Sequence, residues 1–172
     1  MEMIKSQLIG NLVYSNSKEA YTLIKKSYFG ERKDEKVQYN LLEAFYLVKK
    51  NKMEIIQKNK IISKEELIKK FEKLDKNFMM KYLVFEDLRN KGNIVKTALK
   101  FGTDFRVYEK GKNPVTEHAK WVVSVQKSNF KINWNEFSSK NRVAHSTKKN
   151  LLIAIVDEEG GILYYEIKWM KM

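Results

Sequence analysis

The chain is organised around three segments, DFRVYEKG (residues 104–111), NPVTEHAKWVVSV (113–125) and NRVAHSTKKNLLIAIVD (141–157). They hold a tyrosine, a histidine and a lysine, each at the edge of an expected element: Tyr108, His118 and Lys149. A phenol, an imidazole and an ammonium group together supply the acid–base chemistry that cleaves RNA through the ribose 2′-hydroxyl, with no metal required. The residues alone show that these three groups are available.

The second half of the chain has the pattern of strands. Three expected strands are IVKTALKF (94–101), DFRVYEK (104–110) and KWVVSVQK (120–127), and LLIAIVD (151–157) with ILYYEIKWM (162–170) forms an expected hairpin around EEGG. Between them, Asn133 and Glu136 have the spacing that caps a helix start, so a helix is expected from Trp134 onward.

The first half is expected to be helical and strand-poor. Apart from short strands in residues 1–14 and a strand-like 53–62, it shows apolar residues at helical spacing. The expected helices are 18–29 (capped by Ser15 or Ser17 and stopped by Gly30), one through Leu41 and Val48, one opened by a Ser63–Glu66 capping box, and 77–90. ERKDEK (31–36) is a charge run that predicts a solvated loop.

Together these elements predict an α+β protein of two small domains. The first, residues 1–75, is a helix-rich α/β domain. The second, residues 76–172, is built on a mixed β-sheet flanked by helices. No Pro- or Gly-rich linker marks the boundary, which we place near Asp75. A chain of 172 residues can bury one respectable core or two small ones.

The net charge of +13 is the strongest signal in the composition. A surplus of this size is typical of a protein with a polyanionic partner, most often a nucleic acid. Thirty of the thirty-four basic residues are lysines, which biased codon usage or growth at high temperature would also produce. We favour RNA or DNA, between which charge alone does not choose.

Several classes of protein are excluded or disfavoured. The chain has no cysteine, so disulfides and thiolate metal sites are excluded. No apolar run is long enough to span a membrane, and the N-terminus makes a poor signal peptide. We expect a cytoplasmic protein without a membrane partner, a metal or another cofactor.

The chain resembles the archaeal tRNA-splicing endonucleases over nearly its whole length. GTDFRVYEKG (102–111), EHAKWVVSV (117–125) and RVAHSTKKNLLIAIVDEEGGILYYEI (142–167) resemble the C-terminal nuclease domain of that family. The preceding half, with KKFEKLDKNFMMKYLVFEDLRNKG (69–92), resembles the N-terminal domain of the short-subunit form. The Tyr–His–Lys spacing and the RVAHS–LLIAIVD run occur together and in order.

The resemblance implies an enzyme that cuts precursor tRNA at both ends of an intron, at a bulge–helix–bulge fold. The implied products carry a 2′,3′-cyclic phosphate and a 5′-hydroxyl, and no metal takes part. By motif, Tyr108 is the general base for the 2′-hydroxyl, His118 is the general acid for the leaving 5′-oxygen, and Lys149 stabilises the negative charge of the phosphorane. An ordinary tyrosine, with a pKa of about 10, is a weak base at neutral pH, and a nearby ammonium favours the phenolate.

Two of these roles have competitors in the sequence. His145 competes with His118 for the imidazole role, although its position between a helix and a strand favours a part in ordering the turn. Lys148 competes with Lys149, and the motif selects the second lysine. Without the family, Tyr108 would be an ordinary strand tyrosine.

The resemblance also implies RNA-binding and assembly residues. Arg142 matches the first of two arginines that hold a flipped bulge base between them, but no arginine follows it. Tyr164 lies near the second position, with Lys168 and Trp169 as looser candidates and Lys148 as a further RNA contact. The family uses an acidic loop to assemble its tetramer, which here corresponds to Asp157, Glu158 and Glu159. A solvated turn is the simple alternative for that tip, but an acidic tip on a chain of net charge +13 suits a basic groove, so we favour the assembly contact.

The resulting hypothesis is a homotetrameric tRNA-splicing endonuclease acting on precursor tRNA. One alternative is the catalytic subunit of a heterotetramer, whose partner supplies the acidic loop. Another is a basic RNA-binding module without catalysis, which would explain the charge but leave the Tyr–His–Lys spacing a coincidence.

Overall fold

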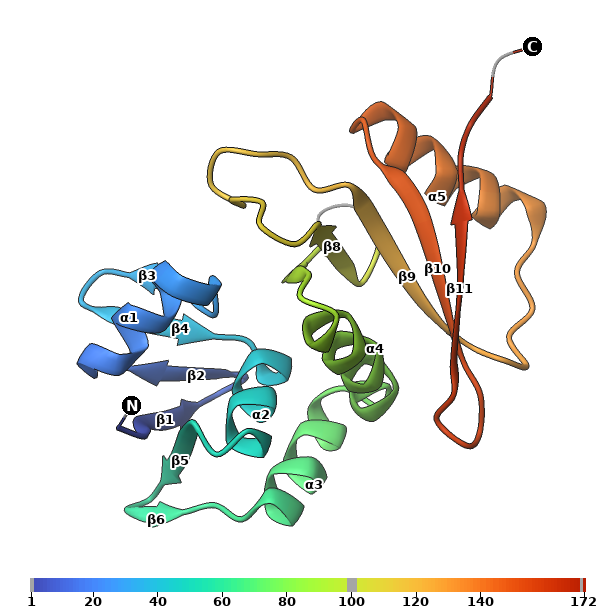
Figure 1. The fold of residues 1–172 in the computed structure, drawn as a ribbon. Coiled ribbons are helices and arrows are strands. Elements are labelled where there is room, and N and C mark those ends of the chain that lie inside the picture. The colour runs from blue at the N-terminus through green and yellow to red at the C-terminus, as the bar shows by residue number, and fades with distance from the viewer. Residues whose placement is uncertain (1, 99–101, 171) are drawn as a thin grey trace. The chain divides into compact units, whose positions relative to one another are not determined.

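The structure, a computed structural model, describes residues 2–98, 102–170 and 172. The chain folds as two compact units, Met1–Tyr82 (unit 1) and Leu83–Met172 (unit 2). The division falls inside helix α4 (Phe78–Asn90), so it comes a little later than the boundary proposed near Asp75 (Figure 1). Each unit has its own sheet.

Unit 1 is built on a six-stranded sheet in the order β3-β4-β2-β1-β5-β6. β1 and β5 run parallel, and the other neighbours are antiparallel. The strands are β1 (Ile4–Ile9), β2 (Leu12–Ser15), β3 (Glu31–Lys33), β4 (Lys36–Tyr39), β5 (Met53–Gln57) and β6 (Lys60–Ile61). Along β1, buried and exposed residues alternate, so one face of the sheet is covered and the other is open.

The helices of unit 1 begin at well-formed caps. They are α1 (Lys18–Ser27), α2 (Leu41–Lys49) and α3 (Lys64–Leu74). Ser17 caps α1, and the predicted Ser63–Glu66 capping box opens α3. Helix α1 ends before the predicted Gly30, because Tyr28 already adopts the left-handed conformation that terminates it. The core beneath these helices is aromatic, with Phe45, Phe71, Phe78 and Tyr82 in edge or stacked contact.

Two expectations about the first half were wrong. Residues of the ERKDEK run form β3 and the start of β4, which pair through Lys33 and Lys36, where a loop was expected. The charged side chains of this hairpin are exposed, so its sequence lacks the apolar pattern of a strand. The strand forms because its backbone gains hydrogen bonds at the edge of the sheet. The first half is accordingly not strand-poor.

Unit 2 is built on a five-stranded mixed sheet in the order β11-β10-β9-β8-β7. The strands are β7 (Ile94–Thr97), β8 (Phe105–Tyr108), β9 (Trp121–Lys127), β10 (Asn150–Val156) and β11 (Ile162–Ile167). Among the described strands of this sheet, only β9 and β10 pair in parallel, and the predicted hairpin is β10–β11. The last residues of the predicted strand 94–101 lie outside the described part of the chain, whereas β7 itself lies inside it.

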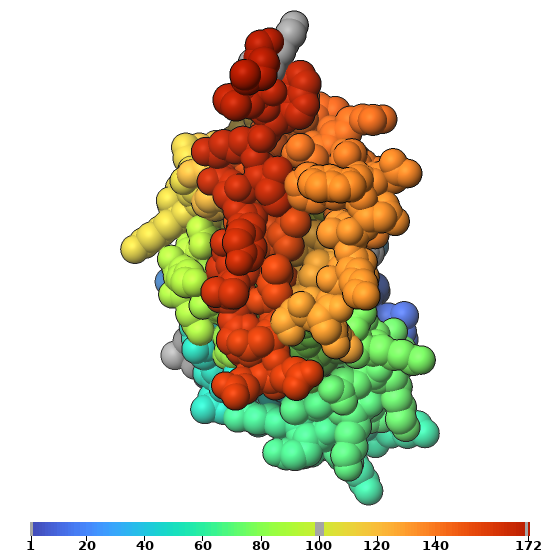
Figure 2. Space-filling view, turned by 90° about the vertical axis from the view of Figure 1, so that its right-hand side faces the viewer, coloured from blue at the N-terminus to red at the C-terminus, as the bar shows by residue number. Residues whose placement is uncertain are grey.

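Helices lie on both faces of this sheet. On one face, Phe85 of α4 contacts Phe105 of β8. On the other, Ala144 of helix α5 (Trp134–Ser146) packs against Val122 and Leu151. Figure 2 shows β11, in red, running along the outside of the unit beside the orange residues of α5. The predicted α+β class and mixed second sheet are therefore confirmed.

In the part of the chain that the structure describes, no helix is long and apolar enough to cross a bilayer.

Candidate active site

The expected catalytic residues lie at one edge of the unit 2 sheet, where strands end or begin. Tyr108 is the last residue of β8, and Lys149 directly precedes β10. Between them lies Lys120, whose N–H donates to the carbonyl of Val107 (2.9 Å) and whose carbonyl accepts from the N–H of Asn150 (2.9 Å). Because β8 runs antiparallel to β9 while β9 and β10 are parallel, the end of β8 coincides with the starts of β9 and β10.

Tyr108 and Lys149 also share a face of the sheet. Arg106 and Tyr108 are two residues apart on β8, so their side chains project from the same side. Burial, and in second place the nearby Arg106 guanidinium, lower the pKa of Lys149 below its usual value. Its Nζ donates to the carbonyl of Thr147 (2.7 Å). The ammonium is thereby held close to the face that carries the Tyr108 ring.

His118 reaches this edge on the loop that joins β8 to β9. A carboxylate fixes the loop: Glu117 pairs with Lys112 (2.7 Å) and accepts from the Asn113 N–H (2.6 Å). These contacts hold the pKa of Glu117 below its ordinary value, the Lys112 hydrogen bond most of all. His118 lies two residues before Lys120 and is exposed, and no described residue hydrogen-bonds its imidazole.

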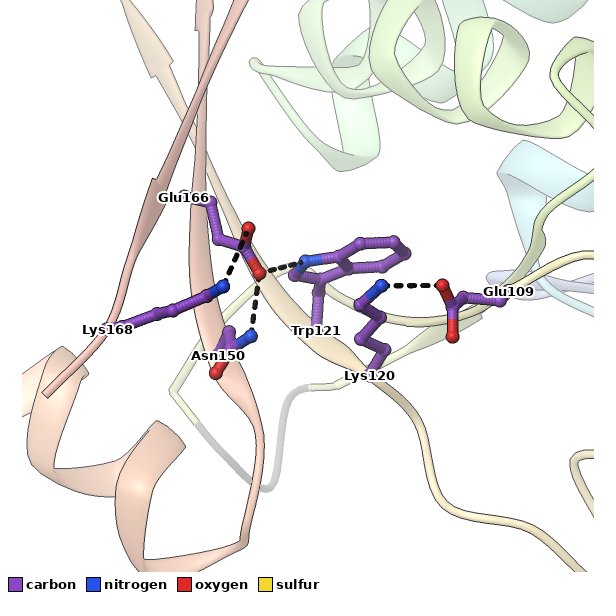
Figure 3. A network of polar contacts seen from close by, with 6 residues as sticks. All are labelled: Glu109, Lys120, Trp121, Asn150, Glu166 and Lys168. Carbon is purple, nitrogen blue, oxygen red and sulfur yellow. Dashed lines mark hydrogen bonds and ion pairs between the residues drawn. The ribbon is translucent and has the colours of Figure 1, made fainter.

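A polar network joins strands β9, β10 and β11 beside the candidate residues (Figure 3). Glu166 of β11 accepts from Trp121 Nε1 (3.0 Å) and from Asn150 Nδ2 (2.6 Å), which lie opposite each other on β9 and β10. The Trp121 hydrogen bond is the main reason that the pKa of Glu166 lies below its usual value. Lys120 lies over the Trp121 ring and pairs with Glu109 (2.5 Å). Three strand ends are therefore tied together at the edge that carries the candidate residues.

A pocket of about 450 Å³ lies between α5 and the segment after β11. Its walls include Arg142, Asn141 and Phe137 of α5. The rings of His145 and Trp169 form the remaining side, with their centroids 4.5 Å apart. Trp169 is 57% exposed, so one face of a large aromatic ring is open beside an exposed guanidinium.

The other expected RNA contacts lie elsewhere in unit 2. Tyr164 pairs with Ala154, on the sheet face opposite the one that packs against α5, and donates to Asp87 (2.7 Å). Burial raises its pKa, and the Asp87 hydrogen bond adds to the effect. The structure therefore does not bring Tyr164 to Arg142. Lys168 is exposed and pairs with Glu166 (3.6 Å), and Lys148 is exposed in the turn after α5.

Two family models match the chain, one to each half. Residues 4–68 match the N-terminal domain of tRNA intron endonuclease, and residues 78–164 match its catalytic C-terminal domain. The second match spans Tyr108, His118 and Lys149. The chain belongs to the tRNA intron endonuclease family. The predicted resemblance is thereby confirmed.

Named relatives in this family match the chain nearly end to end. The tRNA-splicing endonuclease of Thermococcus onnurineus is 40% identical over 99% of this chain and 98% of its own length. That of Pyrococcus horikoshii is 38% identical over 98% and 97%. The tRNA-splicing endonuclease of Nanoarchaeum equitans is 44% identical over 76% of this chain and 88% of its own.

The acidic tip of this family member is the turn between β10 and β11. Asp157 shapes it, because one carboxylate oxygen accepts from the N–H groups of Glu159 (2.9 Å) and Gly161 (2.7 Å). A side chain at Gly161 would collide with that carboxylate. Glu158 and Glu159 are exposed, with no ion pair to any described residue.

Sequence reasoning missed three residues of this candidate site. Arg106 could have been found, since it lies two residues before Tyr108 on the same strand and hence on the same face. Glu117 precedes the candidate histidine in the sequence, but its ion pair with Lys112 depends on the conformation of the loop, which the sequence does not specify. No local sequence pattern pointed to Glu166, because its partners are 45 and 16 residues away in the sequence.

Proposed function

We propose that this protein is a tRNA-splicing endonuclease that cuts precursor tRNA at bulge–helix–bulge junctions. The observation that carries the proposal is the convergence of Tyr108, His118 and Lys149 at one edge of the unit 2 sheet, within the span that matches the family's catalytic domain. These groups supply a base, an acid and a cation. The proposed reaction needs no metal.

The reaction is a transfer of the phosphate from the 5′-oxygen to the 2′-oxygen. Tyr108 takes the proton of the 2′-hydroxyl, and that oxygen attacks the phosphorus in line with the bond to the leaving 5′-oxygen. That bond then breaks, and His118 gives its proton to the departing oxygen. The products are a 2′,3′-cyclic phosphate and a 5′-hydroxyl.

Lys149 is the proposed cation that stabilises the charge developing on the phosphorane. A cation held in a partly desolvated position acts more strongly on such charge than one in open water. Its partial burial, which lowers its pKa, is thus part of its role.

The pocket beside α5 is the proposed site for an unstacked bulge base. Arg142 offers a guanidinium plane and Trp169 an aromatic ring, and both surfaces stack on bases of any identity. Trp169, already in contact with His145, takes the second clamping role for which the sequence offered no arginine. Lys148 and Lys168 are proposed phosphate contacts. Tyr164 stays a prediction that the pocket does not support.

The acidic tip is the proposed assembly contact of a homotetramer. In a chain of net charge +13, exposed carboxylates at Glu158 and Glu159 suit a basic surface on another copy. Asp157 preserves the turn that presents them. The solution mass of the purified chain, with and without E158S/E159S, tests this: a tetramer that falls to dimers supports it, and an unchanged mass refutes it.

The cleavage assay compares three RNAs in EDTA: one with both bulges, one with the bulges filled to a continuous duplex, and one with a scrambled stem. The first and third should be cut alike, because a paired A-form stem hides its base edges. The filled duplex should resist, since in-line attack needs an unstacked nucleotide. Equal cutting of the filled duplex would make this a general ribonuclease.

A further inference from the structure

The open face of the unit 1 sheet carries a basic, polar hollow that the proposed chemistry does not use. Its volume is about 180 Å³, and its walls come from four neighbouring strands and their ends. Its polar lining includes Lys5, Gln7, Tyr14, Asn16 and Lys36. Liquid water takes about 30 Å³ per molecule, so the hollow is large enough for an anionic group the size of several waters.

Strand register and alternation place Lys5, Gln7, Tyr14 and Lys36 on one face of the sheet. Gln7 of β1 lies opposite Tyr14 of β2, and Tyr14 lies opposite Gln38 of β4. All three belong to the set that alternates with the buried residues, which include Ile4, Val13 and Val37. The helices of unit 1 cover the buried set, since α2 contacts β2 and β5 there. The hollow therefore lies on the side of the sheet without these helices.

The lysines of this face lack partners within the described residues. Lys5 and Lys36 are exposed and form no ion pair there, and neither does Lys33, which lies opposite Lys36 on the edge strand. The carboxamides of Gln7 and Asn16 likewise have no hydrogen-bond partner among these residues. The hollow thus presents cations and amide donors together, which is the chemistry that binds phosphate oxygens.

The distribution of charge points to the same ligand. Residues 1–82 hold 18 lysines and arginines against 11 aspartates and glutamates, so unit 1 carries +7 of the total +13. A substrate held only at the unit 2 edge would leave this larger share without a polyanion. A phosphate backbone that extends past the cleaved junction would neutralise it.

We propose that the open face of the unit 1 sheet, at Lys5, Lys36, Gln7 and Asn16, binds the phosphate backbone of the RNA substrate away from the cut site. The proposal rests on the proposed function for the identity of the RNA. The contact adds affinity for the body of the substrate and takes no part in the chemistry.

The test compares K5Q/K36Q with the matched control K69Q/K70Q. The control makes the same charge change at two exposed lysines of α3, away from the hollow. Binding is measured by fluorescence anisotropy over a range of salt. The probe is an intron-containing tRNA transcript with 2′-deoxy nucleotides at the cut sites, so that it is not consumed.

K5Q/K36Q should weaken binding on the order of tenfold and lower the salt slope by about 0.7 to 0.9 for each phosphate that the variant no longer neutralises. K69Q/K70Q should change both less, and the cleavage rate at saturating all-ribose RNA should not change in either variant. Equal slopes for the two variants would overturn the proposal. So would a changed solution mass of K5Q/K36Q, which would make this face a contact between copies of the chain.

The two proposals fail separately. If the wild-type chain leaves the all-ribose transcript uncut, the proposed function fails, while the salt slopes still decide whether the unit 1 face binds RNA.

Discussion

Both units are β-sheets packed against helices, but different kinds of residue gather in them. In unit 1 the best-packed residues are aromatic: Phe71 is fully buried and its ring lies 5.2 Å from that of Phe78. In unit 2 the polar residues gather where three strands start or end, around Lys120. The difference shows how a mixed sheet gathers functional residues at one edge. A strand ends at the edge where its antiparallel neighbour begins, and a strand parallel to that neighbour begins there too.

The largest expected effect separates the two histidines of unit 2. H118A should lower the cleavage rate by roughly 10²–10⁴-fold through loss of the general acid, while RNA binding stays nearly intact. H145A is the control and should act mainly on binding, because its ring supports Trp169 at the base pocket. Single-turnover rates at saturating RNA make the comparison, and the reverse order of effects would show that the imidazole role is misassigned.

The two neighbouring lysines should differ next most. K149M should lower the rate by roughly 10²–10³-fold, as expected for a cation aimed at transition-state charge, whereas K148M should act weakly and through binding. Single-turnover rates and binding curves for both variants make the comparison. Equal rate losses would remove Lys149 from its proposed role.

Lys149 also gives the site a pH dependence with a definite sign. Since its pKa is lowered, it loses its proton at a lower pH than an ordinary lysine, and the activity that needs its charge falls as pH rises through that lowered value. R106Q removes one cause of the shift, so the alkaline limb should move to higher pH. A limb that stays in place in the rate–pH profile would mean that another group sets it.

Unit 1 should respond to substitution through stability. F71A removes a fully buried ring from the aromatic core and should cost about 3–5 kcal/mol of folding free energy. Hydrogen exchange should show the loss of protection within residues 1–82. The cleavage rate of molecules that remain folded should not change. A rate loss as large as that of H118A would show that unit 1 also contributes to the chemistry.

The smallest expected effect is at the loop that carries His118. E117Q weakens the ion pair with Lys112 and the hydrogen bond from the Asn113 N–H. The loop should then sample more conformations, and the cleavage rate should fall several-fold. Because protonation does the same to the native carboxylate, wild-type activity should lose this contribution as pH falls through the lowered pKa of Glu117. The mutant should lack that step, and a mutant profile identical to wild type would argue against a positioning role.

Local sequence signals predicted much of the fold. The caps at Ser63 and Asn133 and the β10–β11 hairpin are short-range features, each decided by a few adjacent residues. The Asn40–Glu43 capping box at α2 is a signal of the same local kind. The prediction of a loop at ERKDEK was wrong, because an edge strand is held by backbone hydrogen bonds to its neighbour and needs no apolar face of its own.

The candidate site was predictable only as a set of residue types. Family resemblance named Tyr108, His118 and Lys149, but their meeting depends on strand order and register, which single-sequence patterns do not specify. Trp169 was a loose candidate, and only the ring contact with His145 places it at the pocket of Arg142.

The central claim is that the edge of unit 2 cuts RNA by attack of the substrate's own 2′-hydroxyl. The most direct measurement uses two bulge–helix–bulge RNAs in EDTA, one all-ribose and one with 2′-deoxy nucleotides at the cut positions, with the ends of any product identified by mass. The account predicts that only the all-ribose RNA is cut, leaving a 2′,3′-cyclic phosphate and a 5′-hydroxyl. Cleavage of the deoxy substrate at a similar rate, or products with a 5′-phosphate, would contradict it.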